Sequence, residues 1–250
     1  MGEAAAVRAA LRSVADAALA ILLAPHCAAC HEPLDAPSRG VVCARCWGAI
    51  VPITAPCCRT CGDALPSWRV LSIAESTCAR CRRRPPLVTV ARAIGQYEGS
   101  LRAIVHAFKY GPRPTLARPL AARLRACGGD VLEGADIVVP VPLHASRQRQ
   151  RGFNQAAELA RHLRVPGLDA LDRVRRTASQ ADLPAARRHA NVRGAFAHVA
   201  GVDVTDRIVV LVDDVSTTGA TLNACADALL TAGAREVRAL TVARAVIRRR

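Results

Sequence analysis

Near the carboxyl end of the chain, an uninterrupted apolar run is followed by acids, hydroxyl side chains and an Ala-rich segment. Apolar residues 209–212 lead directly into Asp213 and Asp214, and the Ala-rich residues 220–232 end at Gly233. Such an apolar run suits a central strand of a parallel sheet, and the Ala-rich segment suits the helix that follows it. The hydroxyl-rich turn between them is therefore expected at the carboxyl end of a buried strand.

Upstream segments alternate between strand and helix patterns. Residues 101–110 repeat apolar side chains at the spacing of one helical face and stop at Gly111, and His106 on this helix is expected to be a surface or packing residue. We also expect helices at 4–23, 116–126 and from 155 to His162, strands at 87–97 and 136–142, and a loop at 143–152. The pattern predicts an α/β fold with an open, mainly parallel sheet flanked by helices.

The turn after the predicted central strand offers groups suited to a sugar phosphate. A helix N-terminus has unpaired amides that favour phosphate, and Thr217, Thr218 and Thr221 add hydroxyls. Two carboxylates repel a phosphate, so Asp213 and Asp214 are expected to accept hydrogen bonds from sugar hydroxyls or to hold a divalent cation indirectly. The alternative, in which the acids end a strand and one hydroxyl caps a helix, leaves the acid pair unexplained. A Walker-type phosphate loop is absent from the sequence.

The first third of the chain is dominated by cysteine pairs with metal-ligand spacing. Two intervening residues let both sulfurs of a pair face one ion, and two pairs complete a closed, structural Cys₄ zinc site. Sequential pairing gives two sites, and interleaved pairing satisfies the same spacing. Disulfides, redox chemistry and ligation by His26 or His31 are the alternatives. The eight predicted ligands are Cys27, Cys30, Cys43, Cys46, Cys58, Cys61, Cys78 and Cys81, and Cys57 is left over.

Composition narrows the class of protein without choosing a ligand. The 250 residues are 51% hydrophobic, enough for one good core and a smaller appendage. Lys and Arg number 35 against 20 Asp and Glu, and the net charge of +15 attracts phosphates, nucleic acid or acidic surfaces. Because no apolar run reaches 18 residues and no clean signal-peptide cleavage site follows residue 24, we expect a soluble, cytoplasmic protein without a membrane span.

The motif Val-Asp-Asp-Val-Ser-Thr-Thr-Gly-Ala-Thr resembles the phosphoribosyl pyrophosphate (PRPP) motif of type I phosphoribosyltransferases. The resemblance implies that Asp213 and Asp214 contact the ribose 2′ and 3′ hydroxyls. It also implies that Thr217 stands where purine-salvage members usually carry an Asp, which makes a purine substrate less favoured. The loop that would surround the 5′-phosphate consists of Ser216, Thr217, Thr218, Gly219, Ala220 and Thr221.

Such an enzyme also needs cationic groups for the leaving pyrophosphate. In the 143–152 loop, Arg147 and Arg151 suit that role, and a solvated basic loop is the alternative. Lys109 is either a phosphate contact or a solvated charge at a helix end. A polar, basic segment after residue 172 is expected to close as a lid, or else to be an ordinary surface connection. Its candidate residues are Arg173, Arg176, Thr177, Gln180, Arg188 and Asn191.

Taken in order, the motifs resemble the ComF family over nearly the whole chain. They are four Cys-x-x-Cys knuckles, Phe-Lys-Tyr-Gly, Val-Pro-Val-Pro-Leu, Arg-Gly-Phe-Asn-Gln, Arg-x-x-x-Thr-x-x-Gln, Arg-His-Ala-Asn-Val-Arg-Gly-Ala-Phe and the PRPP motif. The resemblance implies a type I phosphoribosyltransferase fold preceded by a small, Cys-rich double zinc ribbon, and a role in natural transformation. The expected organisation is a helix at 1–24, the double ribbon at 25–86 and the phosphoribosyltransferase-like domain at 87–250.

Two hypotheses follow for the activity. In the first, the protein binds PRPP with Mg²⁺ and transfers the phosphoribosyl group with release of pyrophosphate. The sequence offers no dedicated general base, so the acceptor would be an amine or another self-sufficient nucleophile. In the second, the protein is a non-catalytic module that senses PRPP or binds single-stranded DNA and competence proteins.

Overall fold

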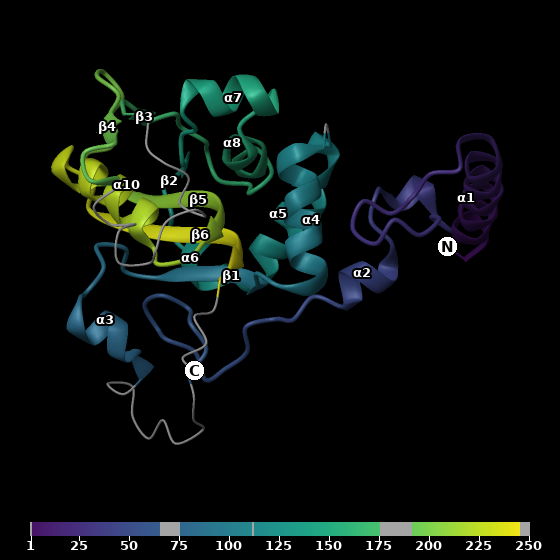
Figure 1. Ribbon diagram of the computed structural model, residues 1–250, viewed down its shortest axis with the longest axis horizontal. Helices are drawn as coiled ribbons and strands as arrows, with labels where there is room; N and C mark the ends of the chain where they lie inside the picture. Colours follow the sequence, from purple (N-terminus) through teal and green to yellow (C-terminus); the bar gives the residue numbers. More distant parts are fainter. Residues whose placement is uncertain (1, 66–75, 112, 176–191, 246–250) are drawn as a thin grey trace.

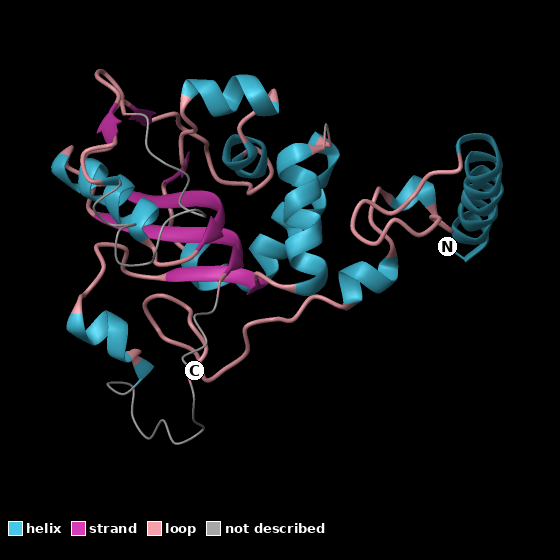
Figure 2. Cartoon of the chain, viewed as in Figure 1, coloured by secondary structure: helices cyan, strands magenta, loops and turns pink. Residues whose placement is uncertain are grey.

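The computed structural model describes residues 2–65, 76–111, 113–175 and 192–245 (Figure 1). A parallel four-stranded sheet, drawn in magenta in Figure 2, forms its centre, with the strand order β1-β6-β5-β2. The predicted central strand is confirmed, because β5 pairs with β6 on one side and with β2 on the other. The strands are β1 (Ala91–Gln96), β2 (Ile137–Pro140), β5 (Ile208–Ser216) and β6 (Glu236–Arg244).

Alternate residues of β5 enter opposite layers, as the period of a strand requires. Val210 and Val212 pack into the core shared with helices α4, α5 and α8, whereas Val209 and Leu211 pack into the core shared with α10. Both faces of the sheet are therefore covered, which explains the uninterrupted apolar run. The helices are α4 (Gly99–Tyr110), α5 (Ala117–Cys127), α8 (Gln155–Ala160) and α10 (Ala220–Thr231), with short α6 (Gly129–Leu132) and the 3₁₀ turn η3 (Pro114–Leu116) beside α5.

Helix α10 begins and ends at glycines with positive φ. Gly219 has φ 79° at its N-cap, and Gly233 has φ 99° just past its end. There the N–H of Gly233 donates to the carbonyl of Leu230, and the N–H of Ala234 donates to that of Leu229, both at 3.0 Å. Glycine adopts this left-handed backbone without steric cost, so the predicted helix boundaries are close to those observed.

A second, smaller sheet lies over the α10 side of the main one. Its two antiparallel strands are β3 (Leu171–Arg173) and β4 (Phe196–His198). Both strands contribute to the same core as α10, through Leu171 and Phe196.

The two cysteine-rich knuckle pairs lie at different sides of the sheet domain (Figure 1). The first contains η1 (Pro37–Arg39) and α2 (Ala44–Gly48), and it packs beside α4 and α5, where the Arg123 guanidinium lies 3.8 Å from the Trp47 ring centroid. The second contains α3 (Ala79–Arg83) and packs against β1. The ribbons are thus two separate supports for the larger domain.

The outer edge of β1 is covered by the chain between the ribbons and by the second knuckle. The N–H of Gln96 donates to the Val51 carbonyl at 2.9 Å, and the N–H of Ala91 donates to the Thr60 carbonyl at 2.7 Å. A Cβ on Gly95 would lie only 2.4 Å from the Val51 oxygen, so this approach needs glycine. Covering the edge satisfies backbone groups that would otherwise be open to pairing with another chain.

Helix α1 (Gly2–Leu23) extends from the first ribbon at the far end of the molecule (Figure 1). Asp16, which is buried, accepts a hydrogen bond from the N–H of Ser38 at 2.7 Å, so the helix docks on the ribbon. Leu11, Val14 and Ile21 are exposed. Among the helices in the described part of the chain, none is both long enough and apolar enough to cross a bilayer.

Candidate functional site

A cavity of about 350 Å³ opens at the carboxyl end of β5. Parallel sheets collect their ligands at this end, because the strands deliver their following turns to one edge. Each of the residues predicted to bind PRPP lines this cavity. They are Lys109, Arg147, Arg151, Asp213, Asp214, Ser216, Thr217, Thr218, Gly219, Ala220 and Thr221.

The acid pair is held by cations from other elements. Asp214 is 8% exposed, and its Oδ1 lies 2.8 Å from the Lys109 Nζ on α4. Its Oδ2 lies 3.8 Å from Nη1 of Arg151, which also donates to Gln155 Oε1 at 3.0 Å. Asp213 accepts the N–H of Asp214 at 2.8 Å. A buried carboxylate needs a charged partner, and Lys109 stabilises Asp214 by direct contact.

Burial raises the pKa of Asp213 from its usual 3.8 to about 7, and the negative charge of Asp214 adds to this rise. Lys109 and, more weakly, Arg173 act in the opposite direction. Near neutral pH the carboxyl group of Asp213 therefore holds a proton for a substantial part of the time. A group that stabilises the ionised form, such as a hydrogen-bond donor or a cation, will lower this pKa on binding.

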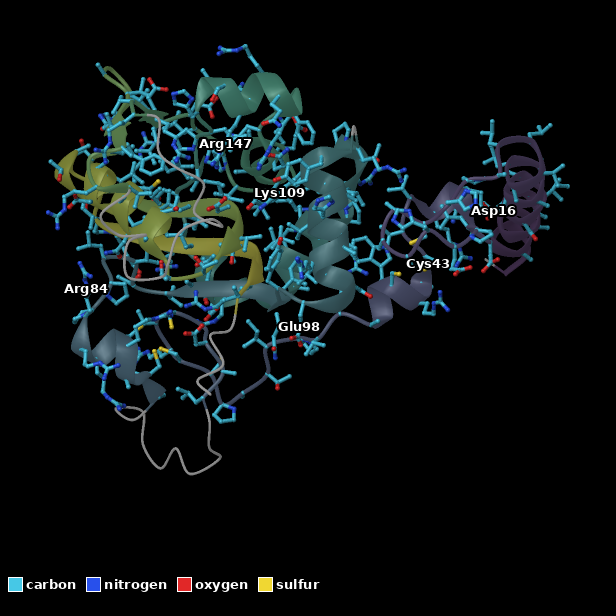
Figure 3. All side chains as sticks on the ribbon, in the orientation of Figure 1. Asp16, Cys43, Arg84, Glu98, Lys109 and Arg147 are labelled. Carbon is cyan, nitrogen blue, oxygen red and sulfur yellow. The ribbon has the colours of Figure 1, made fainter. Side chains whose placement is uncertain are left out.

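The prediction of a loop at 143–152 is wrong, because residues 145–151 form helix α7 (Ala145–Arg151). The Nδ1 of His144 accepts the N–H of Ser146 at 3.2 Å at its start, and Gly152 with φ 78° ends it. Residues four apart share one side of a helix, so Arg147 and Arg151 both reach the cavity, whereas Arg149 is exposed. In Figure 3, Arg147 and Lys109 approach the sheet from α7 and α4.

Part of the predicted lid falls within the described residues. Arg173 lies at the end of β3 rather than in a loop, lines the cavity and places its guanidinium 5.3 Å from the Phe196 ring centroid. Burial lowers its pKa, and the nearby positive charge of Arg147 contributes. The other lid candidates lie outside the described residues: Arg176, Thr177, Gln180, Arg188 and Asn191.

Three aromatic residues of the cavity wall were not predicted as site residues. Tyr97 follows β1, Tyr110 ends α4, and the rings of His106 and Tyr110 pack against each other at a tilt of 46°, with centroids 4.7 Å apart. His106 is exposed, as expected, but it also lines the cavity. The position of Tyr97 immediately after a parallel strand is the sequence signal that could have identified it.

The cysteines form two sets of four, in sequential order: Cys27, Cys30, Cys43 and Cys46, then Cys58, Cys61, Cys78 and Cys81. Within each set the sulfur atoms all lie within 4.8 Å of one another, and neither set includes a histidine or Cys57. The Cys30 and Cys43 sulfurs are 3.8 Å apart, and those of Cys61 and Cys78 are 3.7 Å apart. Tetrahedral zinc with Zn–S bonds of about 2.3 Å requires sulfur separations of about 3.8 Å, so both sets fit zinc.

Backbone N–H groups point at the sulfurs and favour thiolates. Cys27 accepts the N–H of Cys43 at 3.3 Å and that of Ala29 at 3.5 Å, and Cys58 accepts the N–H of Cys78 at 3.3 Å. Burial raises the pKa of the Cys27 thiol, but these backbone groups outweigh it and lower the pKa to about 6. Four thiolates complete the coordination of each ion, so both sites are structural.

Known protein families match both parts of the chain. The double zinc ribbon domain matches residues 18–82, and the phosphoribosyl transferase domain matches residues 149–250. Competence protein F of Haemophilus influenzae is 32% identical over 231 residues, covering 88% of this chain and 97% of that protein. DNA utilization protein YhgH of Salmonella typhimurium is 33% identical over 226 residues, covering 84% and 93%.

Two solved structures align with about half of the chain. An allosteric regulatory enzyme of purine biosynthesis aligns with a TM-score of 0.36 and 25% identity, covering 55% of this chain and 30% of that one. The glutamine PRPP amidotransferase of B. subtilis, complexed with ADP and GMP, aligns with a TM-score of 0.34 and 24% identity over the same shares.

The raised pKa of Asp213 makes stability depend on pH. Ionised Asp213 is disfavoured in the folded state, so its contribution to stability falls as pH rises from about 4 to about 7. Asn at this position does not titrate. The quantity to measure by thermal unfolding is the Tm of Asp213→Asn minus the Tm of the unsubstituted protein. This difference should therefore be about 5 °C more positive at pH 8 than at pH 5. The exposed Asp206, changed to Asn, is the control and should show no such difference. An equal Tm gap at both pH values would contradict the assignment.

Proposed function

We propose that this chain, which belongs to the ComF family, binds PRPP together with Mg²⁺ and transfers the phosphoribosyl group to a nucleophile with release of pyrophosphate. The observation that carries the proposal is the convergence on one cavity of an acid pair, a hydroxyl-rich turn at a helix start and four cationic side chains. The phosphoribosyl transferase domain match, which includes the acid pair and the turn, supports the same conclusion.

Each group has a role that suits its chemistry. Ionised Asp213 and Asp214 accept hydrogen bonds from the two sugar hydroxyls, and residues 217–221 hold the 5′-phosphate through hydroxyls and backbone N–H groups. Arg147 and Arg151 neutralise the pyrophosphate as its bond to the anomeric carbon breaks. Mg²⁺, when bound with PRPP near the acid pair, supplies further positive charge for the pyrophosphate.

Lys109 has a part in both states of the site. Without a ligand its ammonium group neutralises Asp214, at 2.8 Å, and so reduces the repulsion that an incoming anion would meet. When sugar hydroxyls occupy the carboxylates, the same ammonium is free to contact a phosphate.

The acceptor then attacks the anomeric carbon, the new bond forms as the bond to pyrophosphate breaks, and the acceptor's proton leaves to water.

Calorimetric titration of PRPP and Mg²⁺ into the zinc-loaded protein tests the binding. We expect a Kd on the order of 100 µM or tighter. The double variant Asp213→Asn, Asp214→Asn should weaken binding at least about tenfold, because neutral amides leave the sugar hydroxyls and Lys109 without a charged partner. Asp206→Asn should bind as the unsubstituted protein does. Absence of binding by the unsubstituted protein would contradict the proposal.

A pyrophosphate-release assay with a panel of amines and nucleobases then separates the two forms of the proposal. Release that depends on one acceptor supports transfer. Binding without release for any acceptor supports the alternative, a non-catalytic PRPP-sensing module.

We further propose that the protein acts on the cytoplasmic side in the handling of DNA taken up by the cell. The names of its relatives, competence protein F and DNA utilization protein, support this role, as does the net charge of +15. Two closed thiolate sites suit a reducing compartment, where thiols stay available for zinc.

Binding of a labelled single-stranded oligonucleotide, followed by anisotropy over a salt series, tests the DNA role. Neutralising about three phosphates of a single strand predicts a loss of affinity of about twentyfold between about 50 and about 200 mM salt. An uncharged peptide nucleic acid of the same sequence is the control and should bind weakly at every salt concentration. Affinity that does not change with salt would contradict contacts between arginine and phosphate.

A further inference from the structure

The second ribbon contacts the proposed phosphate loop, residues 216–221, through one buried arginine. Arg244 is the last residue of β6, lies opposite Ser216 in the parallel register and is 3% exposed. Its Nη1 donates to the Ser216 hydroxyl at 3.3 Å, and its Nε donates to Asp63 in the ribbon. The guanidinium of Arg244 thus joins the first residue of the loop to Asp63, which precedes Arg244 by 181 residues in the sequence.

Asp63 is itself anchored beside the metal site. Its second oxygen lies 2.7 Å from Nη2 of Arg80, and the same Nη2 donates to the Cys61 sulfur at 3.4 Å. A continuous series of polar contacts therefore runs from a zinc-ligand sulfur through Arg80, Asp63 and Arg244 to the loop. A Cys₄ zinc site has a net negative charge, which favours the two guanidinium groups at these positions.

The backbone of the same knuckle fixes the distance between ribbon and sheet. The N–H of Ala91 in β1 donates to the Thr60 carbonyl at 2.7 Å. Gly62, with φ 70°, lies so close that an added Cβ would come within 2.7 Å of the Ala91 carbonyl oxygen. The N–H of Ala245 donates to the Ser216 carbonyl at 2.9 Å, so the loop is tied to β6 by its backbone as well. Asp63 therefore meets Arg244 at a position set by backbone contacts.

The space between ribbon and loop is too small for a ligand. A cavity of about 70 Å³ lies there, lined by Arg80 and Cys61 from the ribbon and by Ser216, Thr218 and Arg244 from the larger domain. Its volume is about a fifth of that of the cavity beside the acid pair, and Arg244 does not line that larger cavity. Arg244 consequently acts on the loop's position and does not contact a substrate.

We propose that Arg244 and Asp63 are positioning residues that hold the phosphate loop in its ligand-binding shape, so that the second zinc ribbon sets the affinity of the site for a phosphosugar. The identity of that ligand rests on the proposed function, whereas the ordering of the loop does not. The ribbon has a conformational role beyond its own stability, because its contacts end at the first residue of the loop.

The test compares Asp63→Asn and Arg244→Met with Arg92→Met. Arg92 is a matched control because it also joins the sheet to the second ribbon, through the Arg59 carbonyl at 2.9 Å, and forms an ion pair with Asp130 at 2.6 Å. It is absent from the residues that line the proposed site. Asp63→Asn keeps the side-chain shape and leaves Arg244 in place, so the test does not depend on the folding of Arg244→Met. Zinc content is measured for every variant.

The first readout is amide hydrogen exchange in peptides that cover residues 213–221. We expect about tenfold faster exchange there in Asp63→Asn and Arg244→Met, and no change in Arg92→Met. The second readout is the PRPP Kd in the presence of Mg²⁺, which should weaken about tenfold in the first two variants only.

The outcomes separate this inference from the proposed function. Unchanged exchange in the loop overturns the inference, whatever happens to PRPP binding. Faster exchange without weaker PRPP binding also overturns it when the unsubstituted protein binds PRPP. Faster exchange in a protein whose unsubstituted form does not bind PRPP sustains the positioning role and removes PRPP as the ligand.

Discussion

The site depends on two adjacent carboxylates at the end of a central strand, of which Asp214 is buried and Asp213 is partly buried. Asp213 and Asp214 repel each other and lose hydration there, which is why the pKa of Asp213 rises to about 7. The fold compensates by bringing Lys109 from α4 and Arg151 from α7 to Asp214. This arrangement makes the acids compatible with a nearby anion, because the carboxylates are already partly neutralised before a ligand arrives. A sugar that carries phosphates needs both in one cavity: carboxylates that accept hydrogen bonds from its hydroxyls, and cations that offset the repulsion between those carboxylates and its phosphates.

The surrounding architecture holds these elements at fixed positions. The first ribbon packs beside α4, the helix that carries Lys109, and the second packs against β1 and reaches the loop through Arg244. The chain between the ribbons covers the edge of β1, where Gly95 permits the close approach. The ribbons therefore support the site from two sides, although neither contributes a residue to the wall of its cavity among those described.

Local patterns in the sequence were sufficient for the features that depend on neighbouring residues. The apolar run before Asp213 predicted the central strand, and the Cys-x-x-Cys spacing predicted both sets of thiols, because each signal lies within a short stretch of chain. The prediction of a loop around Arg147 was wrong. Three alternating arginines suggested a solvated loop, but the segment is a helix that His144 caps and Gly152 ends. The pair formed by Asp63 and Arg244 had no local signal at all. Their meeting depends on how the ribbon docks, which residue spacing does not encode.

The decisive experiment is a crystal structure of the zinc-loaded protein with PRPP and Mg²⁺. We expect the ribose hydroxyls to contact Asp213 and Asp214, the 5′-phosphate to lie within residues 217–221, and the pyrophosphate to face Arg147 and Arg151. PRPP bound elsewhere, or bound with its phosphate turned away from this loop and its sugar away from the acids, would contradict this expectation.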